Sequence, residues 1–168
     1  MPNPVIYIMG VSGSGKTTIG KRLSLVTGIP FFDADDWHPA ANKEKMKAGL
    51  PLDDEDRKEW LVQLNKLAIE QTHHKGAIIA CSALKKKYRL QLEENIQSPV
   101  HWVLLEGTYE LILARMRARK DHFMPPTLLA NQFATLEKPE HALILDISND
   151  PELLVEAICN EFHLPVQG

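Results

Sequence analysis

The sequence predicts an α/β fold: a three-layer sandwich with a mainly parallel five-stranded sheet between two layers of helices. Short apolar runs rich in β-forming residues alternate with longer segments of helical periodicity along all 168 residues. The apolar runs are hydrophobic on both faces, as strands buried in a parallel sheet are. Alternating strands and helices imply right-handed crossovers, which cover both faces of the sheet. We expect a single domain spanning residues 1–168, because the length suits one core and no linker or repeat interrupts it.

The first half of the chain contains three predicted strands separated by helices. One helix begins near Lys16 and ends at Gly28, a residue suited to a helix C-terminus. A short helix follows Pro39. A longer helix carries the acids of 53–56 in its first turn, where the helix dipole favours negative charge. The predicted strands are Val5–Met9, Phe31–Asp33 and Ala77–Cys81.

The second half repeats this alternation and supplies two more strands. The predicted strands are Val100–Leu105 and Ala142–Asp146. The predicted helices follow Leu84, run from Tyr109 to about Lys120, follow the Pro125-Pro126 pair, and run from Pro151 to Phe162.

Composition and charge argue against several classes of protein. The chain is 44% hydrophobic and 24% charged, which is typical of soluble proteins, and its net charge of −3 disfavours a general nucleic-acid or membrane-surface binder. No apolar run approaches the roughly 20 residues that span a bilayer, and no signal peptide is recognisable. Cys81 and Cys159 lack metal-type spacing, so we expect buried free thiols and a cytoplasmic protein.

A glycine-rich segment between the first predicted strand and helix indicates a phosphate-binding loop. Residues 10–17 read Gly-Val-Ser-Gly-Ser-Gly-Lys-Thr and match G-x-x-x-x-G-K-[ST] in the required strand–loop–helix context. The alternative, a chance glycine-rich turn, does not explain this placement. The loop predicts binding of ATP with Mg²⁺, in which Lys16 reaches the β- and γ-phosphates and Thr17 ligates the metal. The residues expected to contact ATP here are Gly10, Ser12, Gly13, Ser14, Gly15, Lys16, Thr17 and Thr18.

Two acids end the second predicted strand. Asp33 and Asp35 follow Phe31-Phe32, and the carboxyl ends of parallel strands line the ligand crevice of such sheets. Phosphoryl transfer to an alcohol needs one carboxylate near Mg²⁺ and another to orient or deprotonate the hydroxyl. We assign Asp33, with Thr17, to the metal and Asp35 to the hydroxyl. The alternative is that both acids cap the next segment. Asp146, at the end of a late strand, is interpreted as a turn or cap residue.

These acids belong to a longer pattern of residues. It consists of Asp33–Pro39, Asn42, Lys45-Met46, Gly49, Pro51-Leu52, Asp54, Asp56-Arg57, Trp60-Leu61, Cys81–Lys86, Tyr88-Arg89, Arg119-Lys120, His122–Pro125, Gln132-Phe133, Leu136-Glu137 and Pro139. The pattern resembles the gluconokinase family. One departure is Asp121, where members often carry a glycine.

The resemblance covers the chain to about Pro139 and implies ATP-dependent phosphorylation of D-gluconate to 6-phosphogluconate. It also implies a nucleoside-monophosphate-kinase-like fold related to shikimate kinase, and a homodimer. One alternative is a kinase of the same fold for another sugar acid or a shikimate-like acceptor. Another is a non-catalytic ATP-sensing module, although a sensor needs neither an acceptor base nor a water-excluding lid.

Four residues are candidates for binding the sugar acid. Lys85 and Arg89 are four positions apart, which would place them on one helix face with an anion between them. Arg57 offers a planar guanidinium suited to a carboxylate, and His38 follows the two acids and is a candidate partner for hydroxyls. The alternative for Lys85 is that it belongs to a solvated run with Lys86 and Lys87.

A second basic cluster precedes the Pro-Pro interruption and predicts a mobile lid at about residues 115–128. Arg115 and Arg119 are expected to share a helix face, to approach the phosphates and to help exclude water, whereas Arg117 is expected to be solvated. Nucleic-acid binding by these cations is disfavoured by the acids at 33–36 and 53–56. The residues expected to act in catalysis are Lys16, Asp35 and Arg119.

Overall fold

The sheet at the centre of the molecule has five parallel strands in the order β2-β3-β1-β4-β5. A computed structural model of the chain describes residues 3–119 and 126–167. The parallel α/β sandwich predicted from the sequence is confirmed. The strands are β1 (Val5–Met9), β2 (Phe31–Asp33), β3 (Ala77–Ala80), β4 (Val100–Glu106) and β5 (Leu143–Asp146).

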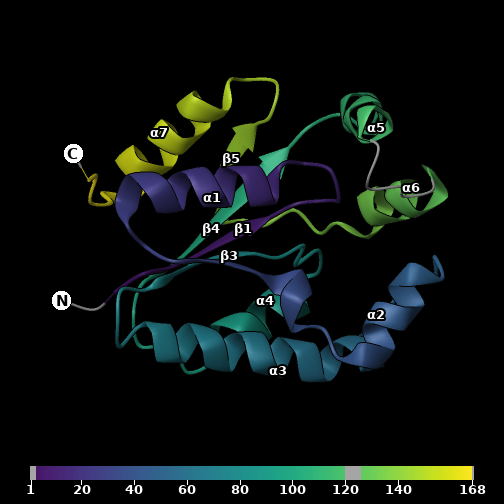
Figure 1. The fold of residues 1–168 in the computed structure, drawn as a ribbon, viewed down its shortest axis with the longest axis horizontal. Coiled ribbons are helices and arrows are strands. Elements are labelled where there is room, and N and C mark those ends of the chain that lie inside the picture. Colours follow the sequence, from purple (N-terminus) through teal and green to yellow (C-terminus); the bar gives the residue numbers. More distant parts are fainter. Residues whose placement is uncertain (1–2, 120–125, 168) are drawn as a thin grey trace.

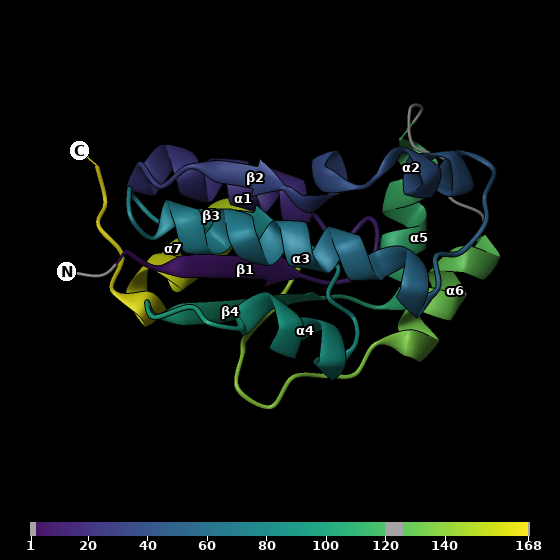
Figure 2. The same ribbon diagram turned by 90° about the horizontal axis from the view of Figure 1, so that it is seen from below.

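Helices cover both faces of the sheet and gather at one of its ends. In Figure 1, α1 (Lys16–Thr27) and α7 (Pro151–Phe162) lie on one face, and α3 (Asp54–Gln71) and α4 (Lys86–Glu93) lie on the other. Figure 2 shows that the strands point toward the end where the remaining helices lie, away from the two termini. These remaining elements are the 3-10 helix η1 (Ala34–Trp37), α2 (Ala40–Lys47), α5 (Tyr109–Ala118) and α6 (Pro126–Thr135).

The central strand β1 divides the hydrophobic core into two parts. All five of its side chains are buried. Ile6 and Ile8 belong to the cluster that includes Leu23 of α1, whereas Tyr7 belongs to the cluster that includes Leu64 of α3. Because successive strand residues point to opposite faces, this continuous apolar run serves both layers of helices. It fixes the strand whose carboxyl end leads into the glycine-rich loop.

Local signals end α1 and begin α3 where the sequence predicts. Gly28 ends α1 with φ 78°, a left-handed conformation that favours glycine. Asp53 caps α3: its carboxylate accepts from the Asp56 backbone N–H, and the Asp56 carboxylate accepts from the Asp53 N–H. Within the described ranges no helix is long and apolar enough to cross a bilayer.

Both cysteines are free and buried, as predicted. Burial raises the pKa of the Cys81 thiol to about 12 and also raises that of Cys159. Because only a thiolate reacts readily, a raised pKa makes both thiols less reactive at neutral pH.

Candidate active site

The glycine-rich loop joins β1 to α1 in a conformation that only glycines adopt easily. Gly10, Gly13 and Gly15 have φ angles of 149°, 79° and 100°. A Cβ atom at Gly10 would lie 2.8 Å from Ser14 Oγ and 2.9 Å from the Leu105 carbonyl oxygen. The first N–H groups of α1 have no acceptor within the helix, and the helix dipole adds positive potential at this end. The loop therefore fits a phosphate group.

The ammonium of Lys16 is folded over the start of this loop. Its Nζ donates to the carbonyl oxygens of Gly10, at 2.9 Å, and Val11, at 3.0 Å. Burial lowers the pKa of Lys16, and the nearby charge of Asp35 opposes this effect. The side chain is therefore already held beside the position that the polyphosphate would take.

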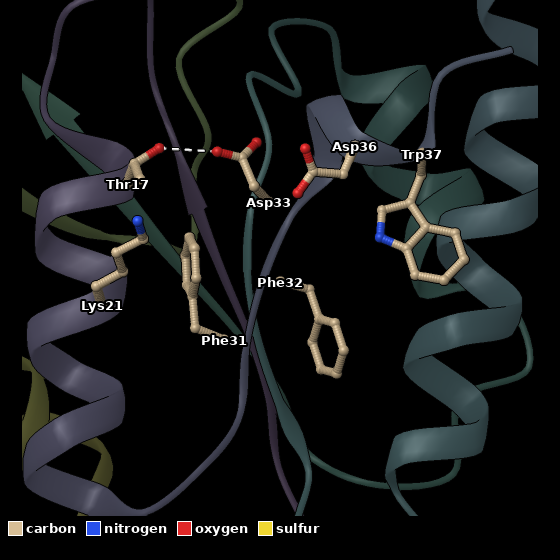
Figure 3. A pocket seen from close by; sticks show the side chains of 7 residues that line it. All are labelled: Thr17, Lys21, Phe31, Phe32, Asp33, Asp36 and Trp37. Atoms are coloured by element: carbon tan, nitrogen blue, oxygen red, sulfur yellow. Dashed lines mark hydrogen bonds between the residues drawn. The ribbon is translucent and has the colours of Figure 1, made fainter. Parts of the chain in front are cut away.

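Thr17 and Asp33 form the expected pair beside the phosphate loop. The Thr17 hydroxyl donates to Asp33 Oδ2 at 2.9 Å (Figure 3). Asp33 Oδ1 accepts from the Asp35 N–H at 3.0 Å. Asp33 thus caps η1 as well as facing Thr17. No cluster of three or more His, Cys, Asp or Glu side chains suited to a metal occurs among the described residues. One hydroxyl and one carboxylate suit Mg²⁺, which is usually held largely by phosphates and water.

A large cavity of about 1040 Å³ connects the phosphate loop with the predicted acceptor residues. Its walls come from the loop, η1, the start of α3, the end of β3 and one side of α6. The predicted site residues that line it are Ser12, Gly13, Gly15, Lys16, Thr17, Thr18, Asp33, Asp35, His38, Arg57, Lys85 and Arg119. Gly10 and Ser14 of the loop are buried and do not line this cavity.

A smaller cavity of about 610 Å³ lies on the outer side of the edge strand β2. In Figure 3, Phe31 lies toward Lys21 of α1, while Asp36 and Trp37 project from η1 on the other side. Thr17 and Asp33 line both cavities, so the candidate metal pair lies between them.

Asp35 and His38 occupy contrasting environments in the large cavity. The Asp35 side chain is 80% exposed, whereas the His38 side chain is 4% exposed and stacks on Trp60 with ring centroids 4.1 Å apart. Burial, followed by the charges of Arg57 and Lys43, lowers the pKa of His38 to about 4. His38 is therefore neutral at pH 7, and its Nε2, 3.8 Å from Asp35 Oδ1, does not form an ion pair there.

The low pKa of His38 predicts that the protein loses stability as the pH falls from 6.5 toward 4. In this window the unfolded chain binds a proton at His38 and the folded chain does not, so the free energy of unfolding rises with pH. The contribution reaches up to about 3 kcal/mol above pH 6.5. Urea unfolding between pH 4.5 and 7.5 measures it, and a His38→Phe variant, which keeps an aromatic ring on Trp60, should show a shallower pH dependence. An unchanged slope would contradict the prediction.

A polar cluster surrounds the candidate acceptor cations. Asp54 lies 3.6 Å from Lys85 Nζ and accepts hydrogen bonds from Lys87 and the Tyr88 hydroxyl. These two bonds, with the charge of Lys85, lower the pKa of Asp54 to about 2. Arg57 donates to the Leu52 carbonyl oxygen at 2.7 Å and to the Tyr88 hydroxyl at 3.2 Å. Lys85 and Arg57 are therefore oriented at the cavity wall by neighbouring groups.

The expected pairing of Lys85 with Arg89 on one helix face is wrong. Lys85 has φ −109° and ψ 142° and precedes α4 as its N-cap, so helical spacing does not relate the two side chains. Arg89 is buried, and its guanidinium donates to the carbonyl oxygens of Ala83, at 2.7 Å, and Glu137, at 2.8 Å. Arg89 braces the loop after β3 instead of lining the described cavity.

Arg115 and Arg119 also separate, because α5 ends at Ala118. Arg119 has an extended backbone and lines the large cavity. Arg115 donates to the Ile147 carbonyl oxygen at 2.7 Å, in the loop after β5. The shared helix face expected for this pair is therefore wrong as well. The rest of the predicted lid, residues 120–125 with Lys120, Asp121 and His122–Pro125, lies outside the described residues.

Several cavity residues carry no predicted role. Asp54 was expected as an acid in a first helical turn and Trp60 as part of the family pattern, yet both line the cavity. Gln132 of α6 accepts a hydrogen bond from the Ser12 backbone N–H at 2.7 Å. The sequence signal for these three residues was that they belong to the pattern from Asp33 to Pro139. That pattern does not say what each residue does.

The fold and the cavity define a phosphate-loop kinase of a small molecule. The family model described as shikimate kinase matches residues 12–146. The thermosensitive gluconokinase of Escherichia coli (strain K12) is 46% identical over 89% of this chain and 82% of its own. A probable gluconokinase of Dictyostelium discoideum is 44% identical over 93% of this chain and 84% of its own. The crystal structure of a sugar kinase from Janibacter sp. HTCC2649 superposes with a TM-score of 0.88 at 40% identity, covering 97% of this chain and 96% of that one. The chain belongs to the gluconokinase family.

Proposed function

We propose that this protein transfers the γ-phosphoryl group of ATP to the 6-hydroxyl of D-gluconate, giving 6-phospho-D-gluconate and ADP. The observation that carries the proposal is the single cavity that contains both the phosphate loop and the acceptor residues Asp35 and Lys85. The relatives named gluconokinases support this choice of acceptor. A purely ATP-sensing module would not need acceptor residues in the same cavity.

Each residue has a role that follows from its position. The loop amides and Lys16 hold the phosphates, and Thr17 with Asp33 supports Mg²⁺, which supplies charge neutralisation. The Asp35 carboxylate, exposed to the cavity, orients the acceptor hydroxyl and takes its proton. Lys85 and Arg57 offer cationic donors for the carboxylate of the sugar acid, and neutral His38 offers a hydrogen bond to a hydroxyl.

Three further features belong to the proposal. Residues 115–128 form a lid in one domain of 1–168, and Arg119 brings positive charge to the transferring phosphoryl group. The exclusion of water by a lid protects ATP from hydrolysis. The enzyme works in the cytoplasm, in keeping with its two free thiols. It acts as a homodimer, in keeping with the family resemblance.

The direct experiment is a panel of sugar acids in a coupled assay of ADP release. D-gluconate should give the highest kcat/KM, with shikimate and aldonates of other chain length well below it. If ADP is released but no member of the panel is phosphorylated, the proposal that the protein is a kinase is wrong. A clear preference for another acid would change only the identity of the acceptor.

A Lys85→Met variant should raise the KM for gluconate while leaving the KM for ATP within about twofold. The loss of one charge-assisted hydrogen bond to a carboxylate corresponds to about a tenfold rise or more. The matched control is Lys87→Met, since Lys87 contacts the same Asp54 but is exposed away from the described cavity lining. Initial-rate kinetics with both substrates varied separate the two KM values. If Lys85→Met changes only the KM for ATP, Lys85 serves the donor and not the acceptor.

A further inference from the structure

A contact between Gln132 and Ser12 joins helix α6 directly to the phosphate loop. The Ser12 backbone N–H donates to Gln132 Oε1 at 2.7 Å, and Gln132 Nε2 donates to Ser12 Oγ at 3.2 Å. One carboxamide therefore engages both the backbone and the side chain of a single loop residue. The two residues lie 120 positions apart, so the contact joins two walls of the cavity that the chain does not otherwise connect locally.

The contact lies at the part of the loop that also holds the Lys16 ammonium. Lys16 Nζ binds the carbonyl oxygens of Gly10 and Val11, the two residues directly before Ser12. In phosphate loops this lysine reaches the β- and γ-phosphates, whereas the backbone N–H groups of the loop cradle the α- and β-phosphates. Ser12 follows the two carbonyl groups that hold the ammonium and lines the cavity, so it lies on the side of the loop where the γ-phosphate would bind, and its N–H is held by Gln132.

Helix α6 also lines the cavity along one side. Leu128, Asn131, Gln132 and Thr135 are lining residues, and they recur at the three- and four-residue spacing of a single helix face. This helix begins directly after residues 120–125, at the end of the proposed lid. A shift of α6 would carry the Gln132 carboxamide with it and so change the hydrogen bond of the Ser12 N–H.

We infer that Gln132 is a positioning residue for phosphoryl transfer, which sets the Ser12 end of the loop for a γ-phosphate and couples it to helix α6. The inference rests on the proposed function in so far as the γ-phosphoryl group is the one transferred. Gln132 acts through Ser12. Its loss should therefore affect ligands that carry a γ-phosphate more than those that end at the β-phosphate.

The test compares two nucleotides by titration calorimetry in the presence of Mg²⁺: ADP and a non-hydrolysable ATP analogue. Gln132→Met keeps the length of the side chain but removes both hydrogen bonds to Ser12. It should weaken the ATP analogue about five- to tenfold, the loss of one hydrogen bond or slightly more, and change ADP binding less than twofold. Gln132→Glu keeps an acceptor for the Ser12 N–H but places negative charge near the γ-phosphate. It should also weaken the analogue selectively, and the effect should diminish at high salt.

Gln91→Met is the matched control, since Gln91 is an exposed glutamine of α4 and lies outside the described cavity lining. Equal losses for ADP and the analogue, or a lower Tm with unchanged affinities for both, would overturn the inference and leave Gln132 a stabilising contact. If Gln132→Met does not fold, the affinity of Gln132→Glu for the ATP analogue relative to its affinity for ADP decides the question. The measurement needs no acceptor. A wild-type enzyme that phosphorylates no sugar acid would therefore contradict the proposed function without affecting this result.

Discussion

An Asp35→Asn variant is expected to bind ATP normally and to lose about 10²- to 10⁴-fold in kcat, the range that a positioned general base contributes. Asparagine keeps the size of the side chain and its hydrogen-bonding capacity but cannot accept the proton of the acceptor hydroxyl. The Asp33 carboxylate accepts bonds from Thr17 and from the Asp35 N–H, in keeping with its assignment beside the metal. The Asp35 side chain is 80% exposed and lines the cavity.

The neighbouring acid provides a control for this variant. Asp36 follows in the same 3-10 helix and lines the smaller cavity. Asp36→Asn therefore changes the charge by the same amount a short distance away, and should leave kcat within about threefold because exposed charges are well screened. Initial rates at saturating gluconate, together with calorimetry of a non-hydrolysable ATP analogue, separate chemistry from binding. Equal effects of the two variants would show that charge alone matters, and near-normal turnover of Asp35→Asn would remove Asp35 from the mechanism.

Replacing Lys16 by methionine should lower kcat by about 10²- to 10³-fold, as expected when one preorganised electrostatic donor to the transition state is removed. The ammonium is held at the loop by the carbonyl oxygens of Gly10 and Val11, so little reorganisation is needed when phosphate arrives. Methionine fills a similar volume without the charge. The KM for gluconate should change little, because Lys16 serves the donor.

Lys21→Met is the control for Lys16→Met. Lys21 lies on the same helix, α1, but lines the smaller cavity and not the large one. Single-turnover measurements with excess enzyme distinguish a slower chemical step from slower release of ADP. A Lys16→Met variant whose single-turnover rate equals that of the wild type would show that Lys16 does not stabilise the transferring phosphoryl group.

The order and type of the elements follow from local signals in the sequence, and so do the loop and acid parts of the site. Gly28 and Asp53 act within a few residues of their own positions, so the pattern around each of them is sufficient to predict a helix end. Thr17 and Asp33 meet because the ends of β1 and β2 lie at the same edge of the sheet, a property of parallel sheets in general.

The contacts that escaped prediction depend on single dihedral angles or on distant segments. Spacing places Lys85 and Arg89 on one helix face only if both are helical, and the extended backbone of Lys85 removes that condition. The partner of Arg89 at Glu137 lies 48 positions away, and the partner of Gln132 lies 120 positions away. No pattern among neighbouring residues predicts such long-range contacts. They arise from the packing of α4 and α6 against the loops at the end of the sheet.

The place of β1 at the centre of the sheet has a consequence for how the protein is made. Val5–Met9 leave the ribosome before both of their hydrogen-bonding neighbours, which are Ala77–Ala80 on one side and Val100–Leu104 on the other. A nascent chain that ends before residue 100 has a central strand with an open edge, and closing loops of this length carries an entropic cost. The sheet that carries the phosphate loop can therefore be completed around β1 only after β4 has been synthesised.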